Sequence, residues 1–426
     1  MSLAPVAALL LSVFILLAGN GLQGTILPIR ADIEGFSASA IGGIGAAYYL
    51  GFTLGCLAGP HAIRRVGHIR AFAALAAIAA AASMLHALIV SPIPWYVFRC
   101  LTGICFAGLY MIIESWLNER STNENRGRLL SVYQSVNLTA ITGGQFLLNA
   151  ADPAGFELFG IITVLIGLGL VPVALTTATA PQPIQETKLR IGWLYGISPV
   201  AVLGCLAVGL ANGAFWSMAP VFARLSGLDV SQIAIFMAVA IVGGALLQLP
   251  LGRMSDHYDR RYVIIGACLL SAASGLGLAF LGGHSNLVML GLAFLFGGFA
   301  LPIYALSIAH ANDLVEPGDR IGVSGGLLLV FGLGAIAGPV VAAAVMDVAG
   351  HEALFWFTAA IHVVTAGFAY YRTKRRVVPP AEERDNFVLV NVSSPAVFRI
   401  DPRTPDQGDN GAPPPADEDG AGPSVP

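Results

Sequence analysis

The short polar stretch that decides the fold reads Gly252-Arg253-Met254-Ser255-Asp256-His257-Tyr258-Asp259-Arg260-Arg261. It lies between two long apolar runs, near residues 230–251 and 262–281. Hydrocarbon would leave the charges and open backbone groups of such a turn without water. The sequence therefore predicts that this stretch lies at a membrane surface, where two transmembrane helices meet the aqueous phase.

The composition independently indicates a membrane protein. Hydrophobic residues make up 56% of the 426 residues and charged residues only 11%, whereas soluble domains carry about 25% charged residues. The net charge is −3, so no basic excess points to nucleic acid as a partner. The five cysteines lie inside apolar runs without a C-x-x-C pair. This pattern favours packing over disulfides, and it indicates neither a metal site nor a cofactor.

Twelve apolar runs are long enough to cross a bilayer, which takes about 20 residues per helix. The first run, residues 3–29, lacks the basic start, short core and cleavage site of a secretory signal, so it is predicted to be the first helix. The other runs lie near residues 38–60, 69–90, 94–117, 128–150, 156–178, 197–222, 230–251, 262–281, 286–309, 322–346 and 353–371. The sequence thus predicts an all-α membrane protein with 12 transmembrane helices.

Basic residues gather in alternate loops between these runs. If the N-terminus is inside, the outside loops hold only Arg30 and Arg224, and the remaining Arg and Lys of the loops are inside. Cytoplasmic loops are enriched in Lys and Arg. The sequence therefore predicts a multi-pass protein with both termini in the cytoplasm.

The two sets of six runs are copies of one another. A shift of 192 residues places Asn20-Gly21 on Asn212-Gly213 and Pro28 on Pro220. Later in the repeat the best shift is 195, as if three residues were inserted; it pairs Gly103 with Gly298 and Gly143 with Gly338. We therefore expect two pseudo-symmetric bundles of six helices.

The composition also divides the chain into segments. We expect a first bundle at residues 1–179, a cytoplasmic linker at 180–196, a second bundle at 197–376 and a cytoplasmic tail at 377–426. The tail is rich in Pro, Asp, Glu and Gly, and its end, Gly411–Pro426, has almost nothing to bury, which predicts disorder. Apolar residues recur between Asn386 and Ile400. The alternative for this part of the tail is that it docks on the cytoplasmic face of the protein.

Several motifs resemble the major facilitator superfamily. The spacing Gly-x-x-x-Asp-x-x-x-Arg-Arg from Gly252 to Arg261 is similar to the loop that joins the second and third helices of each half in that superfamily. Arg99-x-x-x-Gly103 resembles its fourth-helix arginine motif. The resemblance covers about residues 3–376 and implies two six-helix halves related by an axis along the membrane normal, in a solute transporter.

The first-half loop departs from the superfamily pattern, because Arg64 stands where an Asp is expected. With Gly19-Asn-Gly-Leu-Gln-Gly24 and Glu114-Ser-Trp-Leu-Asn118, this loop resembles a bacterial branch called YcaD-like. The resemblance implies a bacterial inner membrane. It also calls into question any role that needs a first-loop carboxylate.

Candidate cavity residues follow from the resemblance, since helices 1, 4, 7 and 10 line the central pathway in this superfamily. An amide in lipid is costly unless it is paired, so the polar residues of these helices must face the cavity, water or one another. The alternative is that they bond neighbouring helices. Asn137, on the fifth helix, is an additional candidate. The full set is Asn20, Gln23, Tyr110, Asn137, Asn212, Trp216 and Tyr304.

Candidate gating and coupling residues carry charge. The resemblance links Arg99 to proton coupling; alternatively its side chain reaches the outer interface. We also predict that Arg64 pairs with Glu114 at the inner end of the first half, the alternative being that Arg64 faces lipid phosphates. The signature loop adds Asp256, Arg260 and Arg261.

The sequence therefore predicts a secondary transporter that works by alternating access, without an enzymatic activity. The helix 1 amides suggest an uncharged polar cavity for a neutral or amphipathic organic solute. Glycine spacing in helix 11 resembles an antiporter motif, which favours proton-coupled export; uptake or facilitated passage is the alternative mode. A non-transporting receptor or a membrane enzyme is the alternative class, although neither H-E-x-x-H nor G-x-S-x-G occurs. The expected partners are a small solute, protons and lipid, with the chain as a monomer.

Overall fold

The computed structural model of the chain describes residues 4–122, 124–175, 191–282, 285–375, 384–390 and 392–402. Within these ranges the backbone forms helices and turns. The first half contains α1 (Ala4–Ile33), α2 (Ala38–Val66), α3 (His68–Leu88), α4 (Pro92–Glu119), α5 (Arg126–Phe146), η1 (Leu147–Ala150), α6 (Glu157–Gly169) and α7 (Val171–Ala174). After α8 (Ile191–Ile197), the second half contains α9 (Pro199–Leu225), α10 (Val230–His257), α11 (Arg260–Leu281), α12 (Asn286–Ala300), α13 (Ile303–Asn312), η3 (Pro317–Asp319), α14 (Arg320–Ala349) and α15 (Ala353–Thr373).

Among the described residues, eleven helical stretches are long and apolar enough to cross a membrane. Two of them are broken helices, in which α6 continues into α7 and α12 into α13. The helix α5 is the exception, because polar residues such as Gln134, Asn137 and Gln145 interrupt its apolar character. It nevertheless packs against α1 and α10. The twelfth span thus stays a prediction that rests on the position of α5.

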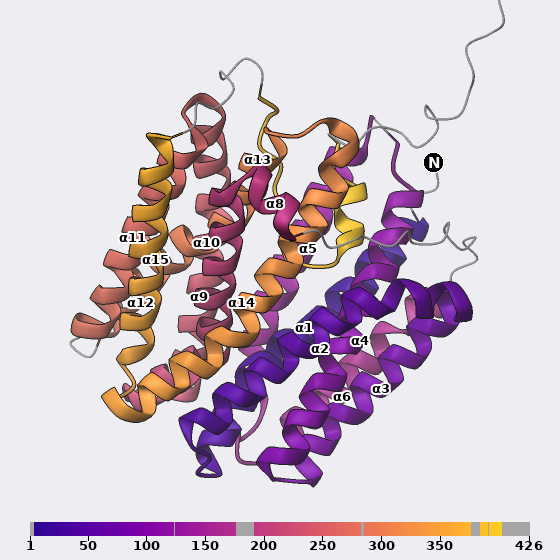
Figure 1. Cartoon of the computed structure of the whole chain (residues 1–426). Helices are drawn as coiled ribbons and strands as arrows, with labels where there is room; N and C mark the ends of the chain where they lie inside the picture. Colours follow the sequence, from indigo (N-terminus) through magenta and orange to yellow (C-terminus); the bar gives the residue numbers. More distant parts are fainter. Residues whose placement is uncertain are drawn as a thin grey trace, which may run out of the picture.

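The two halves lie side by side and repeat the same helix contacts (Figure 1). In the first half α1 packs against α5 and α6, α2 against α4, and α3 against α6. In the second half α9 packs against α14 and α15, α10 against α12, and α11 against α15. Each half is therefore built from the same set of helix pairs.

Turns and caps repeat as well. Gly35 and Gly227, 192 residues apart, both have positive φ angles, 76° and 90°, which glycine adopts without steric cost. Two residues after each glycine stands an N-cap, Ser37 for α2 and Asp229 for α10, whose side chain accepts a backbone hydrogen bond of the new helix. The same local chemistry thus starts the second helix of each half.

Close glycine contacts correct the register predicted for the later helices. A Cβ at Gly144 would collide with the carbonyl of Ala18, and a Cβ at Gly338 with that of Leu210. Ala18 and Leu210 are 192 residues apart, but Gly144 and Gly338 are 194 apart. In the same way Gly103 corresponds to Gly297, which is one residue before Gly298. The second shift is therefore 194 within these helices, and the predicted pairing of Gly143 with Gly338 is off by one.

The two ends of the bundle differ. We call the end that carries the Gly252–Arg261 turn the arginine end. At the opposite end the halves are tied together, since Asp32 of α1 forms an ion pair with Arg224 of α9. The Asp347 carboxylate of α14 also accepts hydrogen bonds from the first backbone N–H groups of α2, at 3.2 and 3.0 Å, where the helix dipole favours an anion.

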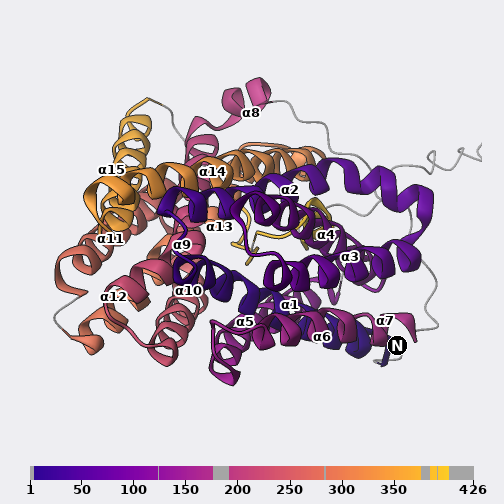
Figure 2. The same ribbon diagram turned by 90° about the horizontal axis from the view of Figure 1, so that it is seen from below.

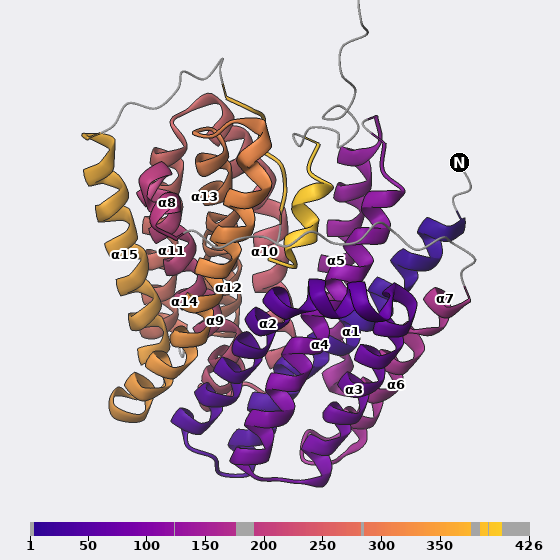
Figure 3. The same cartoon turned by 45° about the vertical axis from the view of Figure 1, so that its right-hand side comes forward.

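The tail segment, residues 384–402 without Asn391, lies between the two halves at the arginine end (Figures 2 and 3). It ends in a short helix, η5 (Pro395–Arg399), which packs against α4 of the first half and α14 of the second. In the structure this part of the tail is therefore docked against the helices of both halves. The stretch predicted to be disordered, Gly411–Pro426, and most of the predicted linker lie outside the described residues.

Candidate functional site: a central cavity between the halves

A cavity of about 270 Å³ lies between the two halves. Helices α1, α2, α4 and α5 supply its wall on the first half, and α9, α10, α13 and α14 supply it on the second. Val390 and Val392 of the tail segment also line it. The tail therefore forms part of the cavity wall on the side of the arginine end.

Six of the seven candidate cavity residues lie in its wall, namely Asn20, Tyr110, Asn137, Asn212, Trp216 and Tyr304. The seventh, Gln23, is placed elsewhere. Its side chain is fully buried and its Nε2 donates to Ser83 Oγ of α3 at 3.0 Å. The prediction that Gln23 lines the cavity is therefore wrong. The Gln23 side chain is longer than that of Asn and reaches α3, so Gln23 bonds a neighbouring helix, as the alternative interpretation expects.

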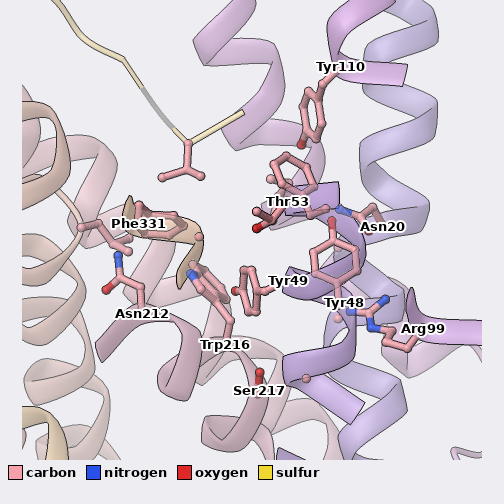
Figure 4. Close-up of a pocket in the computed structure, with 18 of the residues that line it drawn as sticks. Asn20, Tyr48, Tyr49, Thr53, Arg99, Tyr110, Asn212, Trp216, Ser217 and Phe331 are labelled. Atoms are coloured by element: carbon pink, nitrogen blue, oxygen red, sulfur yellow. The ribbon is translucent and has the colours of Figure 1, made fainter. Parts of the chain in front are cut away.

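Aromatic side chains of α2 form a large part of the wall, and the sequence analysis missed them. Tyr48, Tyr49 and Phe52 line the cavity with Thr53, and Figure 4 shows Tyr48 and Tyr49 between Arg99 and Trp216. Across the cavity, the rings of Tyr304 and Phe331 lie 5.3 Å apart. The signal in the sequence was a pair of aromatic positions one helical turn apart, 48 and 52, in a helix otherwise rich in Gly and Ala.

Arg99 corrects the prediction of an uncharged cavity. Its side chain lines the wall and is 8% exposed. The guanidinium lies over the Tyr48 ring, 4.2 Å from its centroid, an arrangement that attracts a cation to the ring face. Its Nη1 has no hydrogen-bond partner among the described residues. A cation therefore borders the cavity with a free donor.

Three other buried polar atoms in the wall lack partners within the described part of the chain: Asn20 Oδ1, Asn212 Oδ1 and the Tyr304 hydroxyl. Buried polar groups are almost always hydrogen-bonded in folded proteins. An orphaned group costs about 1–3 kcal/mol. Because these atoms come from both halves and surround one cavity, a bound molecule is the natural partner for them.

The predicted ion pair between Arg64 and Glu114 is not formed in this structure. Glu114 is fully buried, whereas Arg64 is exposed at the end of α2. The Glu114 carboxylate instead accepts hydrogen bonds from the Tyr133 hydroxyl at 2.9 Å and from the Ser394 hydroxyl of the tail at 2.5 Å. One hydroxyl of α5 and one of the tail thus bond the carboxylate in place of the predicted arginine, which stays at the surface.

Arg260 is the centre of the signature loop. Its side chain is 1% exposed and bonds Asp313 at 2.6 Å and Asp256 at 3.2 Å. Ser255 accepts a third bond at 2.7 Å. In this way one arginine ties α10, α11 and the end of α13 together.

The neighbouring arginine has a different role. Arg261 bonds Asp259 at 2.7 Å and donates to the Arg372 carbonyl at the end of α15, at 3.1 Å. Burial alone raises the pKa of Asp259, but its hydrogen bonds with Arg261 outweigh this effect, and the pKa is lowered. Arg261 therefore fastens the loop to the last helix of the half.

No group of three or more His, Cys, Asp or Glu side chains that could hold a metal ion occurs in the described ranges.

Comparison with known proteins identifies the family. The family model described as Major Facilitator Superfamily matches residues 9–245 and again 201–402. The chain belongs to the major facilitator superfamily. The two matches begin 192 residues apart (201 − 9), which is the shift of the internal repeat.

Proteins that are similar to this chain in sequence or in fold include transporters of several kinds. The uncharacterized MFS-type transporter YcaD of Escherichia coli is 25% identical over 362 residues, which are 84% of this chain and 94% of the relative. This match confirms the resemblance to the YcaD-like branch. The fold is similar to that of a mutant of the nucleoside transporter NupG, with a TM-score of 0.75, 14% identity, and coverage of 86% of this chain and 98% of that one. A D-xylose-proton symporter gives a TM-score of 0.68, 14% identity, and coverage of 89% and 98%.

Proposed function

We propose that this protein is a secondary transporter that carries a small amphipathic organic solute through the central cavity by alternating access. Membership in a transporter superfamily and the two repeated halves support this mode. The halves are tied at the opposite end through Asp32 and Arg224. Rocking about the cavity would break those ties and bring the arginine ends together.

The observation that carries the proposal is the set of four unpartnered polar atoms around one cavity. Asn20 and Asn212 offer acceptors from opposite halves, Arg99 offers a charged donor, and Tyr304 offers a hydroxyl. The tyrosine and phenylalanine rings of the wall suit a flat apolar body. The solute we propose therefore has an apolar, preferably aromatic, part and an acceptor group that pairs with Arg99.

The test uses a library of metabolites and drugs with the purified protein, since a ligand that binds the folded state raises the melting temperature. We expect compounds that stabilise the wild type and lose most of that effect in Asn20→Ala and Asn212→Ala. Gln23→Ala is the matched control, because this amide lies on the same helix but bonds α3. Each shift is measured against the variant's own melting temperature. Compounds that stabilise the Asn variants as well as they stabilise Gln23→Ala would contradict the cavity assignment.

For the mode of transport we propose proton-coupled export, with uptake or facilitated passage as the second candidate. Glu114 is the proposed proton carrier, because it is a fully buried carboxylate that accepts hydrogen bonds from the Tyr133 and Ser394 hydroxyls. It lies one turn along α4 from Tyr110, which lines the cavity. A proton could therefore compete with these hydroxyl bonds close to the solute.

We also propose that the arginine end faces the cytoplasm, together with both termini. The distribution of Arg and Lys between the two sets of loops supports this orientation. A reporter that is active only outside the cytoplasm should give signal when fused after Asp152 or Gly350 and none after Arg375. Signal after Arg375 would contradict both the orientation and the even number of spans.

A further inference from the structure

The tail segment makes specific contacts with the second half. Arg260 donates to the Asp385 carbonyl at 2.5 Å, and Arg320 forms an ion pair with the Asp385 carboxylate at 2.5 Å. The backbone N–H of Phe387 donates to the Asp256 carboxylate at 2.8 Å. The Phe387 ring lies against Gly252, where any Cβ would collide with it. The signature loop thus provides both charged partners and a fitted space for the tail.

The same segment continues across to the first half. Val390 is 2% exposed and, with Val392, lines the central cavity. Beyond them, Ser394 donates to Glu114 of α4. The helix η5 then buries its apolar side chains, including Val397 at 1% and Phe398 at 2% exposure. The tail is therefore bound by both halves at once.

We propose that the crevice at the arginine end is a binding site for an extended peptide segment, and that its occupant is the tail segment of this same chain, residues 384–390 and 392–402. Apolar side chains of the segment are buried, and its polar groups meet charged partners at one end and the Glu114 carboxylate at the other. This is the pattern of a fitted ligand, in which main-chain bonds fix the register and side-chain pockets give specificity.

Occupation of this site blocks the transport cycle. The docked segment closes the cavity at the arginine end, while the halves are tied together at the opposite end. It also fills the space into which the halves would move to close that end. Only this consequence rests on the proposed transport function; the docking itself does not. The tail must leave before solute can enter or leave through the arginine end.

The experiment measures access to the cavity and needs no transported solute. Cys56 lines the cavity and is 6% exposed, so it serves as a native reporter once the other four cysteines are replaced by alanine. Three chains in this background are labelled with a water-soluble maleimide: full length, a chain ending at residue 402 and a chain ending at residue 383. Removal of residues 384–402 should speed labelling about tenfold, the change expected if the tail occupies the crevice in about nine molecules of ten.

The chain ending at residue 402 is the matched control and should label as slowly as the full chain. Equal rates in all three chains would overturn the proposal. Because labelling does not require transport, a failure here differs from a failure of the solute screen. If the shortest chain does not elute as folded protein in size-exclusion chromatography, full-length variants decide the matter.

The full-length test exchanges the charges of one contact. Asp385→Arg puts like charges at the contact with Arg320 and should speed Cys56 labelling. The double exchange, Asp385→Arg with Arg320→Asp, restores opposite charges and should slow labelling again. Unchanged labelling in Asp385→Arg, or a double exchange as fast as the single one, would show that this contact does not hold the tail.

Discussion

The two halves of the chain make matching contacts within their helix bundles and different contacts at the arginine end. In the interior, Gly144 meets Ala18 as Gly338 meets Leu210. At the arginine end, Asp256, Arg260 and Asp313 form a buried ion-pair cluster in the second half. With the shifts of 192 and 194, the corresponding first-half residues are Arg64, His68 and Glu119, of which Arg64 and Glu119 are exposed.

This difference shows which part of the repeat carries structure and which part has become specialised. Close helix packing constrains both halves equally, because a membrane interior offers no water to fill a gap and small residues set the helix distance. The loops are free of that constraint. The second-half loop anchors the tail segment through Arg260 and Asp256, and the first-half loop has lost the cluster that would do so.

The largest effect is expected from removing the centre of that cluster. Arg260→Gln removes the ion pair between Arg260 and Asp313, whose side chains are 1% and 3% exposed. Breaking a buried pair costs about 3–5 kcal/mol. The corresponding first-half change, His68→Gln, should cost about 1 kcal/mol. Thermal unfolding of both purified variants measures the difference, and equal losses would mean that the two loops contribute alike.

The next effect tests the corrected repeat register in the interior. Gly144→Ala and Gly338→Ala each press a methyl group onto the backbone of a neighbouring helix, which should cost about 1–3 kcal/mol. The adjacent glycine is the matched control, since a Cβ at Gly143 meets nothing within 4 Å. Gly143→Ala should therefore be neutral. If thermal unfolding shows a larger loss of stability for Gly143→Ala than for Gly144→Ala, the predicted shift of 195 is correct and the shift of 194 is wrong.

Much of this fold could be predicted from the sequence, because its signals are local. Apolar runs of sufficient length give the spans, and recurrences such as Asn20-Gly21 with Asn212-Gly213 give the repeat. The register error arose where glycines stand side by side, Gly143-Gly144 and Gly297-Gly298. A sequence comparison cannot tell which of two adjacent glycines faces the neighbouring helix.

A smaller difference in stability is expected between variants at Asp256 and at Arg64, which occupy corresponding positions in the second-half and first-half loops. Asp256→Asn weakens the ion pair with Arg260 and the bond from the Phe387 N–H, at a cost of about 1 kcal/mol. Because the tail loses an anchor, Cys56 labelling should also become faster. Arg64→Gln changes an exposed side chain and should alter stability by about 0.5 kcal/mol or less, with unchanged labelling. Faster labelling in Arg64→Gln alone would mean that the first-half loop is the anchor.

The site was less predictable than the fold. Asn20 and Asn212 were found because a polar residue in an apolar helix needs a partner. Gln23 was misplaced because composition does not fix the rotation of a helix, and its longer side chain reaches Ser83. The tail segment left only a weak pattern, because its binding site consists of groups from α4, α10, α11 and α14 that come together only in the folded chain.

The smallest effect on stability is expected from Glu114→Gln, yet this variant tests the proposed coupling. The shift of 194 places Glu114 on Ile308, which is 1% exposed, so the carboxylate is a feature of the first half alone. Glu114→Gln keeps one oxygen that can accept from one of the two hydroxyls, and its NH2 group can donate to the oxygen of the other. The melting temperature and Cys56 labelling should therefore stay nearly unchanged. Glu114→Ile copies the second half and removes the acceptor to which the Tyr133 and Ser394 hydroxyls donate, at a cost of about 1–3 kcal/mol.

Glu114→Gln cannot carry a proton, however. In proteoliposomes with an internal pH indicator, a compound found in the melting screen should drive proton movement through the wild type and not through Glu114→Gln, although both still bind it. Gln23→Ala, which changes a buried amide outside the cavity wall, serves as the control and should retain the proton movement. Persistent proton movement in Glu114→Gln would mean that another residue carries the proton. Glu114 would then serve only to bind Ser394 of the tail.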